Sequence, residues 1–204
     1  MTQNAELMRM ARRSLDGKWI LAIGTHLIFI IISAAIQGLT SFFEAAGILY
    51  LITSGPLALG LSIFALNIYR DEEAGVENLF EGFQNFLNSA AAYLLMTLFI
   101  VLWSLLLIIP GIIASISYSQ TIFLMADDPN LGPMEAIDKS KEMMYGYKMK
   151  YFRLMLRIAG LGLLCILTLG IGFFFLIPYA QILMAAFYQD LIGEIPKEEA
   201  TLYE

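Results

Sequence analysis

From residue 87 to residue 125 the chain carries no charged side chain. A helix needs about 20 residues to cross the hydrocarbon core of a bilayer, so this run is long enough for two helices and too long for one. Pro110 and Gly111 stand near its middle. Proline lacks an amide donor and glycine tolerates turn conformations, so the pair favours a reversal of the chain. The run predicts a tight membrane hairpin with helices over residues 87–109 and 112–125.

The composition agrees with a membrane environment. Hydrophobic residues make up 59% of the 204 residues and charged residues 15%, against about 45–50% and about 25% in soluble domains. A water-soluble domain of this size could not hide so much apolar surface. We therefore predict an all-α polytopic membrane helix bundle, formed by residues 1–204 as a single integral membrane domain.

Other apolar runs bring the predicted number of transmembrane helices to about six. They cover residues 19–37, 47–69, 151–167 and 173–192. The first run is too long for the apolar core of a cleavable signal peptide, which has about 7–15 residues, so we expect it to be retained. Cys165, the single cysteine, lies in an apolar run and cannot form an intrachain disulfide.

Short amphipathic segments separate the hairpins. In residues 5–18, Leu7, Ala11 and Leu15 recur at intervals of four among arginines, which predicts a basic helix on a membrane surface; a solvated charged helix is the alternative. Residues 70–86 predict a short interfacial helix. In residues 127–150, Asp127-Asp128-Pro129-Asn130 is typical of a turn and a helix follows over residues 135–150. The same unit thus occurs three times: an amphipathic segment, an apolar helix, a turn and a second apolar helix.

Lysine and arginine are confined to one set of gaps between the apolar runs. All twelve lie in residues 9–18, at Arg70, in residues 139–157 and at Lys197, and an excess of these residues marks the cytoplasmic side. We predict cytoplasmic N- and C-termini, with anionic lipids as partners at residues 9–18 and 139–157. No nucleic-acid-binding motif is present.

Polar residues within the apolar runs are the candidate site. Ionisable groups in a membrane are costly and tend to be functional. His26 is either a proton or ligand site or a histidine bonded to a helix carbonyl, and the Arg157 side chain can reach the inner interface. Asn67, Gln120 and Gln181 are expected to bond across helices. Glu44, in the outer linker, is expected to be solvated.

Proline and glycine mark candidate helix breaks or hinges at Pro56, Pro110, Gly111 and Pro178. Broken helices in corresponding positions point to a transport site, although proline kinks are common in membrane helices. The sequence holds no catalytic fingerprint, no metal-ligand cluster and no cofactor motif. We expect neither metal nor cofactor, and no enzyme.

Several motifs resemble the DUF975 family, a bacterial family of multi-pass membrane proteins of unknown function. They are Ala11-Arg12-x-x-Leu15-x-Gly17-x-Trp19, Leu102-Trp103-Ser104-Leu105, Ile109-Pro110-Gly111-Ile112, Ser117-Tyr118, Ala126-Asp127-Asp128-Pro129, Ala136-Ile137, Ser140-Lys141, Met143-Met144-x-Gly146-x-Lys148, Leu167-Thr168-Leu169-Gly170-Ile171-Gly172, Pro178-Tyr179 and Ala186-Phe187-Tyr188. The resemblance implies a bacterial inner-membrane protein and supplies no activity.

Two function classes follow. The clustered charged segments and the short uncharged turns favour a non-enzymatic membrane module that organises lipids or partner proteins, with a homo-oligomer or a cytoplasmic protein as its partner. His26, the prolines and the short helix 112–125 favour a small transporter or channel for ions or small solutes. Substitution of His26 separates the two, because only a proton-coupled carrier requires the imidazole.

Overall fold

The structure, a computed structural model, describes residues 2–39 and 46–194. In these ranges the chain is helical and contains no strand. The helices are α1 (Asn4–Ser14), α2 (Trp19–Leu39), α3 (Ala46–Arg70), α4 (Asn78–Glu81), α5 (Phe86–Leu106), α6 (Ile108–Ser117), α7 (Thr121–Asp127), α8 (Pro133–Met143), α9 (Lys148–Leu167) and α10 (Phe173–Glu194). The all-α prediction is confirmed.

Five helical stretches of the described chain are long and apolar enough to cross a membrane. They are residues 19–38, 49–70, 86–106, 108–127 and 173–193. The predicted helix over residues 151–167 forms as α9, but it is not among the five because basic residues occupy its first half, from Lys148 to Arg157. The apolar helices support the predicted membrane character of the chain, because lipid can cover an apolar surface of this extent and water cannot.

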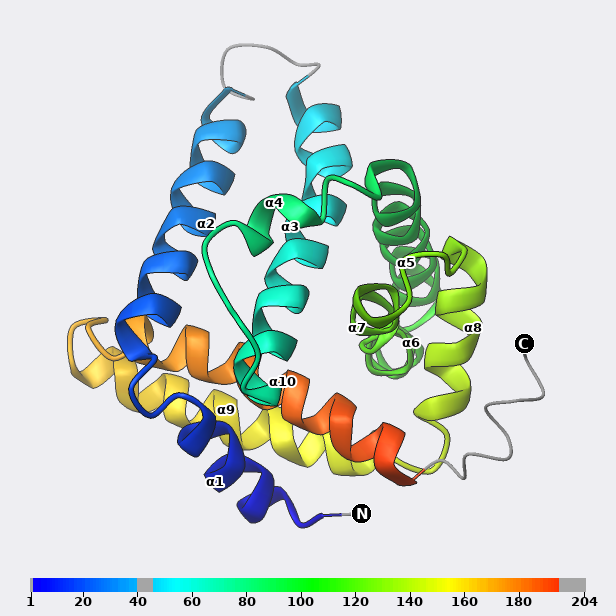
Figure 1. The fold of residues 1–204 in the computed structure, drawn as a ribbon. Coiled ribbons are helices and arrows are strands. Elements are labelled where there is room, and N and C mark those ends of the chain that lie inside the picture. Colours follow the sequence, from blue (N-terminus) through cyan, green and yellow to red (C-terminus); the bar gives the residue numbers. More distant parts are fainter. Residues whose placement is uncertain (1, 40–45, 195–204) are drawn as a thin grey trace.

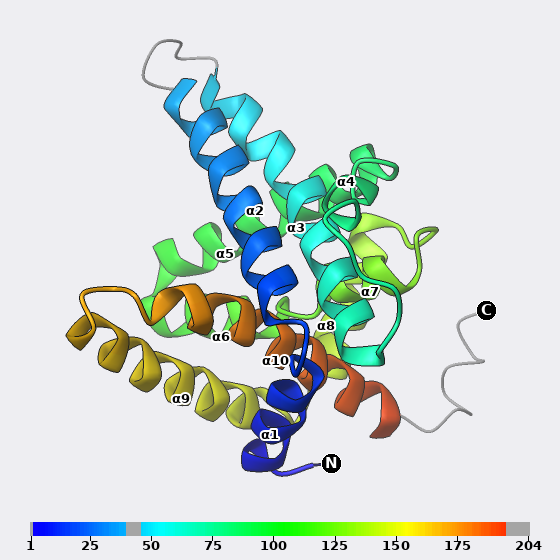
Figure 2. The ribbon, with the colours of Figure 1, turned by 60° about the vertical axis from the view of Figure 1, so that its left-hand side comes forward.

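The long helices form three hairpins that diverge from a common junction. We call α2–α3 the first hairpin, α5–α6 the second and α9–α10 the third. In Figures 1 and 2 each hairpin points in its own direction, and α1, α7 and α8 lie around the junction. Buried side chains gather there, with Leu7, Phe64, Leu154 and Phe187 all fully buried in one cluster. The turns of the second and third hairpins are exposed and apolar, and Leu169 is 95% exposed.

The turn of the second hairpin differs from the prediction. The chain reverses at Leu107, which has extended φ and ψ of −162° and 145°, and not at Pro110-Gly111. Pro110 lies in the first turn of α6, where a helix leaves its amide donors unpaired and proline is tolerated. Gly111 packs against Ser104 so closely that a Cβ atom would overlap its side chain. Glycine therefore serves close helix packing here.

The predicted helix over residues 112–125 is two helices, α6 and α7. Residues 118–120 interrupt it. Ser140 of α8 fills the interruption, since its hydroxyl donates to the Ser117 carbonyl at 2.7 Å and accepts from the Gln120 amide at 3.2 Å. The polar side chain from another helix replaces backbone bonds that a continuous helix would have made.

The predicted breaks at Pro56 and Pro178 are not observed. Pro56 lies inside α3 and Pro178 inside α10, and both helices continue through the proline. A proline removes one backbone hydrogen bond, and packing against neighbouring helices keeps the rest of the helix in place.

The three amphipathic helices follow a cyclic order. Each precedes one hairpin and packs on the hairpin before it: α4 on α3, α8 on α5, and α1 on α10. Helix α1 is followed by Gly17 and α8 by Gly146, and both glycines have positive φ, at 79° and 81°. The left-handed glycine ends the helix and turns the chain into the next hairpin. The structure thus repeats the three-unit pattern of the sequence.

Candidate functional site

An apolar groove of about 520 Å³ runs between α1, α9 and α10. Its lining residues are Met8, Arg12, Trp19, Leu161, Leu164, Cys165, Thr168, Gly172, Phe175, Leu176 and Tyr179. On α9 they recur at intervals of three and four, which places them along one face of the helix. Gly172 has no side chain to block the groove, and Cys165 packs against its Cα.

Two contacts hold the walls of the groove together. The Tyr179 hydroxyl on α10 donates to the Met8 carbonyl on α1 at 3.1 Å. Trp19, at the start of α2, packs on Phe175 of α10 with ring centroids 5.9 Å apart. These contacts fix α1 across the base of the third hairpin, so that a basic helix borders an apolar cavity.

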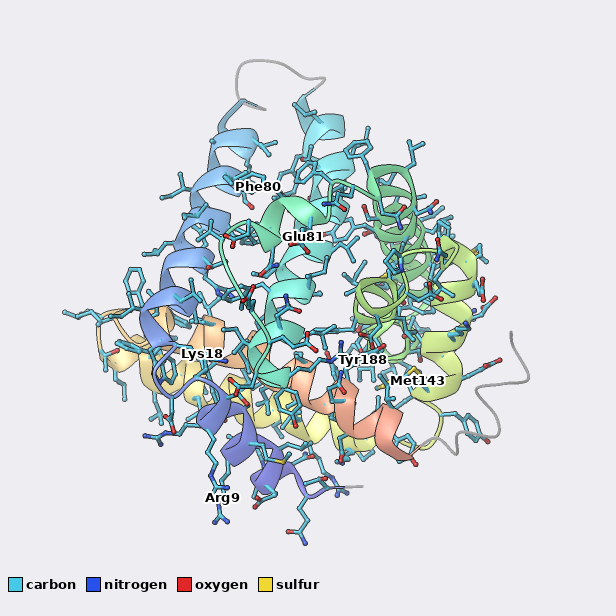
Figure 3. The ribbon with its side chains drawn as sticks, in the orientation of Figure 1. Arg9, Lys18, Phe80, Glu81, Met143 and Tyr188 are labelled. Carbon is cyan, nitrogen blue, oxygen red and sulfur yellow. The ribbon has the colours of Figure 1, made fainter. Side chains whose placement is uncertain are left out.

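Arg12 is the charged residue in the lining of the groove. Arg9 of α1 and Lys18, which follows α1, differ from it. Arg9 pairs with Glu6 at 3.5 Å and points away from the molecule in Figure 3. Lys18 donates to Asp71 at 2.6 Å and holds the pKa of that exposed carboxyl below its usual value. Within the described part of the chain Arg12 forms no ion pair. Its guanidinium is therefore available to an anion beside the groove.

A second polar region lies at the end of α10, where Tyr188 and Gln189 meet α3 and α7. The Tyr188 hydroxyl donates to Asp127 Oδ2 at 2.9 Å, and Arg70 Nη2 lies 2.6 Å from Asp127 Oδ1. The Gln189 amide oxygen, facing α3, accepts from Arg70 Nε at 2.8 Å. The Tyr188 ring stacks on Phe123 with centroids 5.6 Å apart. Tyr188 and Met143 of α8, both labelled in Figure 3, belong to the buried cluster at the junction.

Asp190, the next residue of α10, forms a second ion pair. Lys150 Nζ of α9 donates to its Oδ2 at 2.8 Å, and the Thr2 amide donates to its Oδ1 at 3.0 Å. The Asp190 side chain is only 9% exposed and that of Lys150 20%. The Lys150 ammonium also lies 5.6 Å from the centre of the Phe187 ring. A cavity of about 470 Å³ adjoins Thr2, Tyr69 and Asp190. Because Asp190 is already paired, the network fastens helices together and offers no free charge.

This network was not predicted from the sequence. Asp127 was interpreted as a turn residue, and Arg70 and Lys150 as part of the lysine and arginine excess that marks the cytoplasmic side. Their partners are 57 and 40 residues away in the chain, so spacing along one helix gave no signal. A usable signal was Tyr69-Arg70-Asp71 near one helix end and Tyr188-Gln189-Asp190 near another. Such a recurrence indicates equivalent positions in the three-unit pattern.

His26 is buried, at 3% exposed, between α2 and α3. Its Nδ1 donates to the Ala22 carbonyl at 2.8 Å, and its ring meets Phe64 edge-on at 6.3 Å. Nε2 has no partner among the described residues, and neither has the hydroxyl of the adjacent Thr25. Each alternative for His26 therefore has one observation in its favour. The bond from Nδ1 to a helix carbonyl favours a structural histidine, and the unpaired Nε2 favours a proton or ligand site.

The other predicted site residues lie elsewhere. Gln120 is fully buried beside α8, and its Nε2 donates to Ser119 Oγ at 2.8 Å. Asn67 Nδ2 donates to the Glu73 carbonyl at 3.1 Å, a bond between residues only six positions apart in the chain. Arg157 is exposed on α9 and Gln181 is half-buried on α10. No hydrogen bond, ion pair or ring contact in the described chain joins these residues to His26 or to one another. Glu44 lies outside the described residues.

A family model described as a protein of unknown function, DUF975, matches residues 1–112 and 104–194. The chain belongs to the DUF975 family. The resemblance noted in the sequence is thus confirmed. Comparison with curated proteins gave no match, and comparison with solved structures gave none. The DUF975 description carries no activity, so the function of this DUF975 protein has to be argued from its groove and its charges.

Proposed function

We propose that this DUF975 protein is a non-enzymatic membrane module that binds an anionic phospholipid and so organises the lipid around it. The apolar groove bordered by Arg12 carries the proposal. An acyl chain fits a slot lined by leucine and aromatic side chains, and its burial contributes about 0.8 kcal/mol per CH₂ group. A guanidinium beside the slot suits a lipid phosphate, which it can bind with two parallel hydrogen bonds.

The depth of the groove in the bilayer supports this ligand. Trp19 lines the groove together with Arg12 and Met8 of α1. Tryptophan and arginine favour the interface between headgroups and hydrocarbon. A lipid placed with its phosphate at Arg12 therefore directs its chain along α9 and α10 toward the turn at Thr168.

The distribution of charge supports an anionic lipid on the cytoplasmic side. In this proposal the protein is a multi-pass protein of a bacterial inner membrane with both termini in the cytoplasm. Lys139, Lys141 and Lys150 are neutralised by carboxylates of the chain itself. Lys148, Arg153 and Arg157 are then the residues of 139–157 that meet anionic headgroups, together with Arg12 and Arg13 of α1. A cytoplasmic protein partner or a second copy would meet the same charged face.

Native mass spectrometry with added phosphatidylglycerol or phosphatidylcholine tests the proposal. We expect tighter binding of phosphatidylglycerol to the wild type, and loss of this binding in Leu164→Trp, which fills the groove. Leu163→Trp is the matched control, because Leu163 is 68% exposed on the same helix and lies outside the lining. Equal binding in all three proteins would contradict the proposal.

Arg12→Gln tests the headgroup contact. Loss of a charge-assisted bond of about 1.5 kcal/mol should weaken phosphatidylglycerol binding about tenfold and phosphatidylcholine binding less, because the choline cation of that lipid already offsets its phosphate charge. Arg9→Gln should change neither, because Arg9 is not among the residues that line the groove. A loss of the same size in Arg9→Gln would show that the total charge of α1, and not the groove, attracts the lipid.

A second candidate function, a small transporter, rests on the open Nε2 of His26 and the unpaired Thr25 hydroxyl. Two buried polar groups without partners are costly unless they meet a ligand or water. Flux of ions and small metabolites into liposomes across a pH gradient tests this. Flux that His26→Leu abolishes without lowering the melting temperature would favour transport. Absence of flux in the folded wild type would leave the lipid-binding proposal alone.

A further inference from the structure

We infer that the second and third hairpins are re-entrant: only their distal halves enter the hydrocarbon, their turns stay in lipid, and both ends of each hairpin leave on the same membrane face. The inference does not depend on the phospholipid in the groove. It concerns which surface of the molecule the hydrocarbon covers.

The position of α4 limits how deep α3 can lie. The backbone of Gly60 packs on the Leu79 carbonyl and that of Gly82 on the Pro56 carbonyl, so α4 sits beside the middle of α3, as Figures 1 and 2 show. If α3 crossed the bilayer over its whole length, the carboxylate of Glu81 would lie near the bilayer centre. Burial of a charged group there costs about 2.5–3.5 kcal/mol even on the mildest scale. The half of α3 that bears α4 therefore lies outside the hydrocarbon.

Helix α8 sets the same limit for α5. Helix α8 contacts α5, and its Ile137 belongs to a buried cluster on which Leu95, Met96 and Phe99, in the middle of α5, pack. The other face of α8 carries the exposed pairs Lys139–Glu135 and Lys141–Asp138, with N–O distances of 3.1 Å and 2.7 Å. These charges require water at the level of Met96. Hydrocarbon can then cover α5 only beyond that level, and this distal half is too short to span a bilayer of about 30 Å.

The turn of the third hairpin is suited to a lipid environment. Its side chains are apolar except for Thr168, and Leu167, Leu169 and Ile171 are 80%, 95% and 63% exposed. Each backbone amide from residue 168 to residue 174 donates within the turn, including Gly172, which donates to Thr168 Oγ1 at 3.1 Å. The Thr168 hydroxyl in turn donates to the Cys165 carbonyl at 2.8 Å. Water would satisfy these groups outside a membrane, whereas hydrocarbon requires internal partners.

The turn of the second hairpin has the same character. Leu105, Leu106, Leu107, Ile108 and Ile109 are between 67% and 78% exposed. The Leu107 amide donates to the Trp103 carbonyl and that of Gly111 to Leu107. Pro110 has no amide hydrogen, so it removes a donor that the first turn of α6 would leave unpaired. Five adjacent exposed aliphatic side chains are unfavourable in water and favourable in lipid.

The divergence of the hairpins agrees with shallow insertion. Because the hairpins point in three directions (Figures 1 and 2), they cannot all follow the bilayer normal. A tilted hairpin of fixed length reaches less deep than an upright one. A molecule seated in the cytoplasmic leaflet, with its hairpins spread below the headgroups, satisfies all of these observations. This arrangement keeps both termini in the cytoplasm, as proposed above, but replaces the multi-pass crossing by re-entrant insertion.

Single cysteines in a Cys165→Ala background test the inference in sealed vesicles of both orientations. Leu107→Cys and Leu169→Cys mark the two turns, and Tyr145→Cys, at a residue 83% exposed after α8, marks the charged face. A membrane-impermeant maleimide should label Tyr145→Cys in one orientation and label neither turn in either orientation. Both turns should react after detergent is added, which shows that the thiols are intact and sterically free.

Spin labels at the same positions give an independent measure of depth. At both turns, collisions with oxygen should exceed collisions with a polar nickel chelate, and at Tyr145 the order should reverse. Labelling of a turn from the face opposite Tyr145 would show that its hairpin crosses the membrane, and would overturn the inference. Labelling from the Tyr145 face would overturn it as well, by showing that the hairpin lies in water. Neither result affects the comparison of Leu164→Trp with Leu163→Trp.

Discussion

At the scale of single residues, burial separates the charges that hold the fold from those that face outward. Asp190 and Lys150 are mostly buried and bonded to each other, whereas Lys141 and Asp138 form an exposed pair on one turn of α8. Exposed pairs contribute about 0–1 kcal/mol, and removal of one member of a buried pair costs several times more. The two pairs should therefore respond differently to the same substitution.

Asp190→Asn should lower the free energy of unfolding by about 2–3 kcal/mol, because it leaves the Lys150 ammonium without its carboxylate. Asp138→Asn, the matched control, should change it by less than about 0.5 kcal/mol. Thermal unfolding in detergent, followed by circular dichroism, measures both. Equal melting temperatures for the two variants would show that the Asp190 network does not stabilise the junction.

His26→Leu should leave the melting temperature unchanged or raise it, since leucine is of similar size and removes an unpartnered nitrogen that costs about 1–3 kcal/mol when buried. His26→Ala should lower stability by about 1–3 kcal/mol because it opens a cavity beside Phe64. Thermal unfolding of the two variants distinguishes the effects. If His26→Leu destabilises as much as His26→Ala, then Nε2 has a partner in the folded protein.

Residue identity predicted part of this picture. The bond of His26 to a helix carbonyl was one of the two alternatives that the sequence offered, and the amphipathic helix α1 followed from the spacing of its apolar residues. The pairing of Asp127 with Arg70 and of Asp190 with Lys150 did not follow, because a local pattern cannot show which distant helix ends meet. Arg12 and Arg9 are alike in sequence, and only the position of α9 and α10 makes one of them border a groove.

At the scale of helices, close backbone packing and one bridging serine position the elements. Gly60 of α3 allows α4 to approach, and a Cβ atom there would overlap the Leu79 carbonyl. Gly24 of α2 has open space around its Cα. We therefore expect substitution by alanine to have opposite effects on stability at the two glycines, although both lie within long apolar helices.

Gly60→Ala should destabilise the protein by about 2 kcal/mol or more, since backbone atoms cannot yield as a flexible side chain would. Gly24→Ala should be neutral or stabilising by up to about 1 kcal/mol, because alanine favours the helix. Chemical denaturation in mixed micelles measures both. Tolerance of alanine at position 60 would mean that α4 does not pack on α3.

Ser140→Ala should cost about 1–2 kcal/mol, because it leaves the Ser117 carbonyl and the Gln120 amide unpaired in a buried site. Ser115→Ala is the control, since the exposed Ser115 hydroxyl bonds only to the Ile112 carbonyl one turn back. Hydrogen exchange at residues 117–121 should rise in the first variant and stay constant in the second. An unchanged exchange rate in Ser140→Ala would show that α8 does not hold the interruption.

Element positions were largely predictable and element ends were not. The apolar runs gave the long helices to within a few residues. The reversal at Leu107 in place of Pro110 was missed, because proline fits the first turn of a helix as well as a loop. The interruption at residues 118–120 was missed because its stabilising partner, Ser140, comes from a different helix.

At the scale of the whole molecule, three units of one pattern close into a ring of contacts. The amphipathic helix of each unit covers the hairpin of the unit before it, and the charged helix ends meet at the junction. The sequence showed the repeat but not the divergence of the hairpins, since hydropathy reports that a helix is apolar and not the direction in which it points. The groove forms where α1 of the first unit crosses the third hairpin.

Photocrosslinking with an anionic phospholipid that carries a diazirine on its acyl chain is the sharpest test of the phospholipid site in the groove. We predict crosslinks concentrated on the groove residues of α9 and α10, from Leu161 to Thr168 and from Phe175 to Tyr179, which compete with unlabelled phosphatidylglycerol and disappear in Leu164→Trp. Crosslinks spread evenly over the exposed apolar positions, including Leu105–Ile109, and insensitive to Leu164→Trp would contradict a specific phospholipid site.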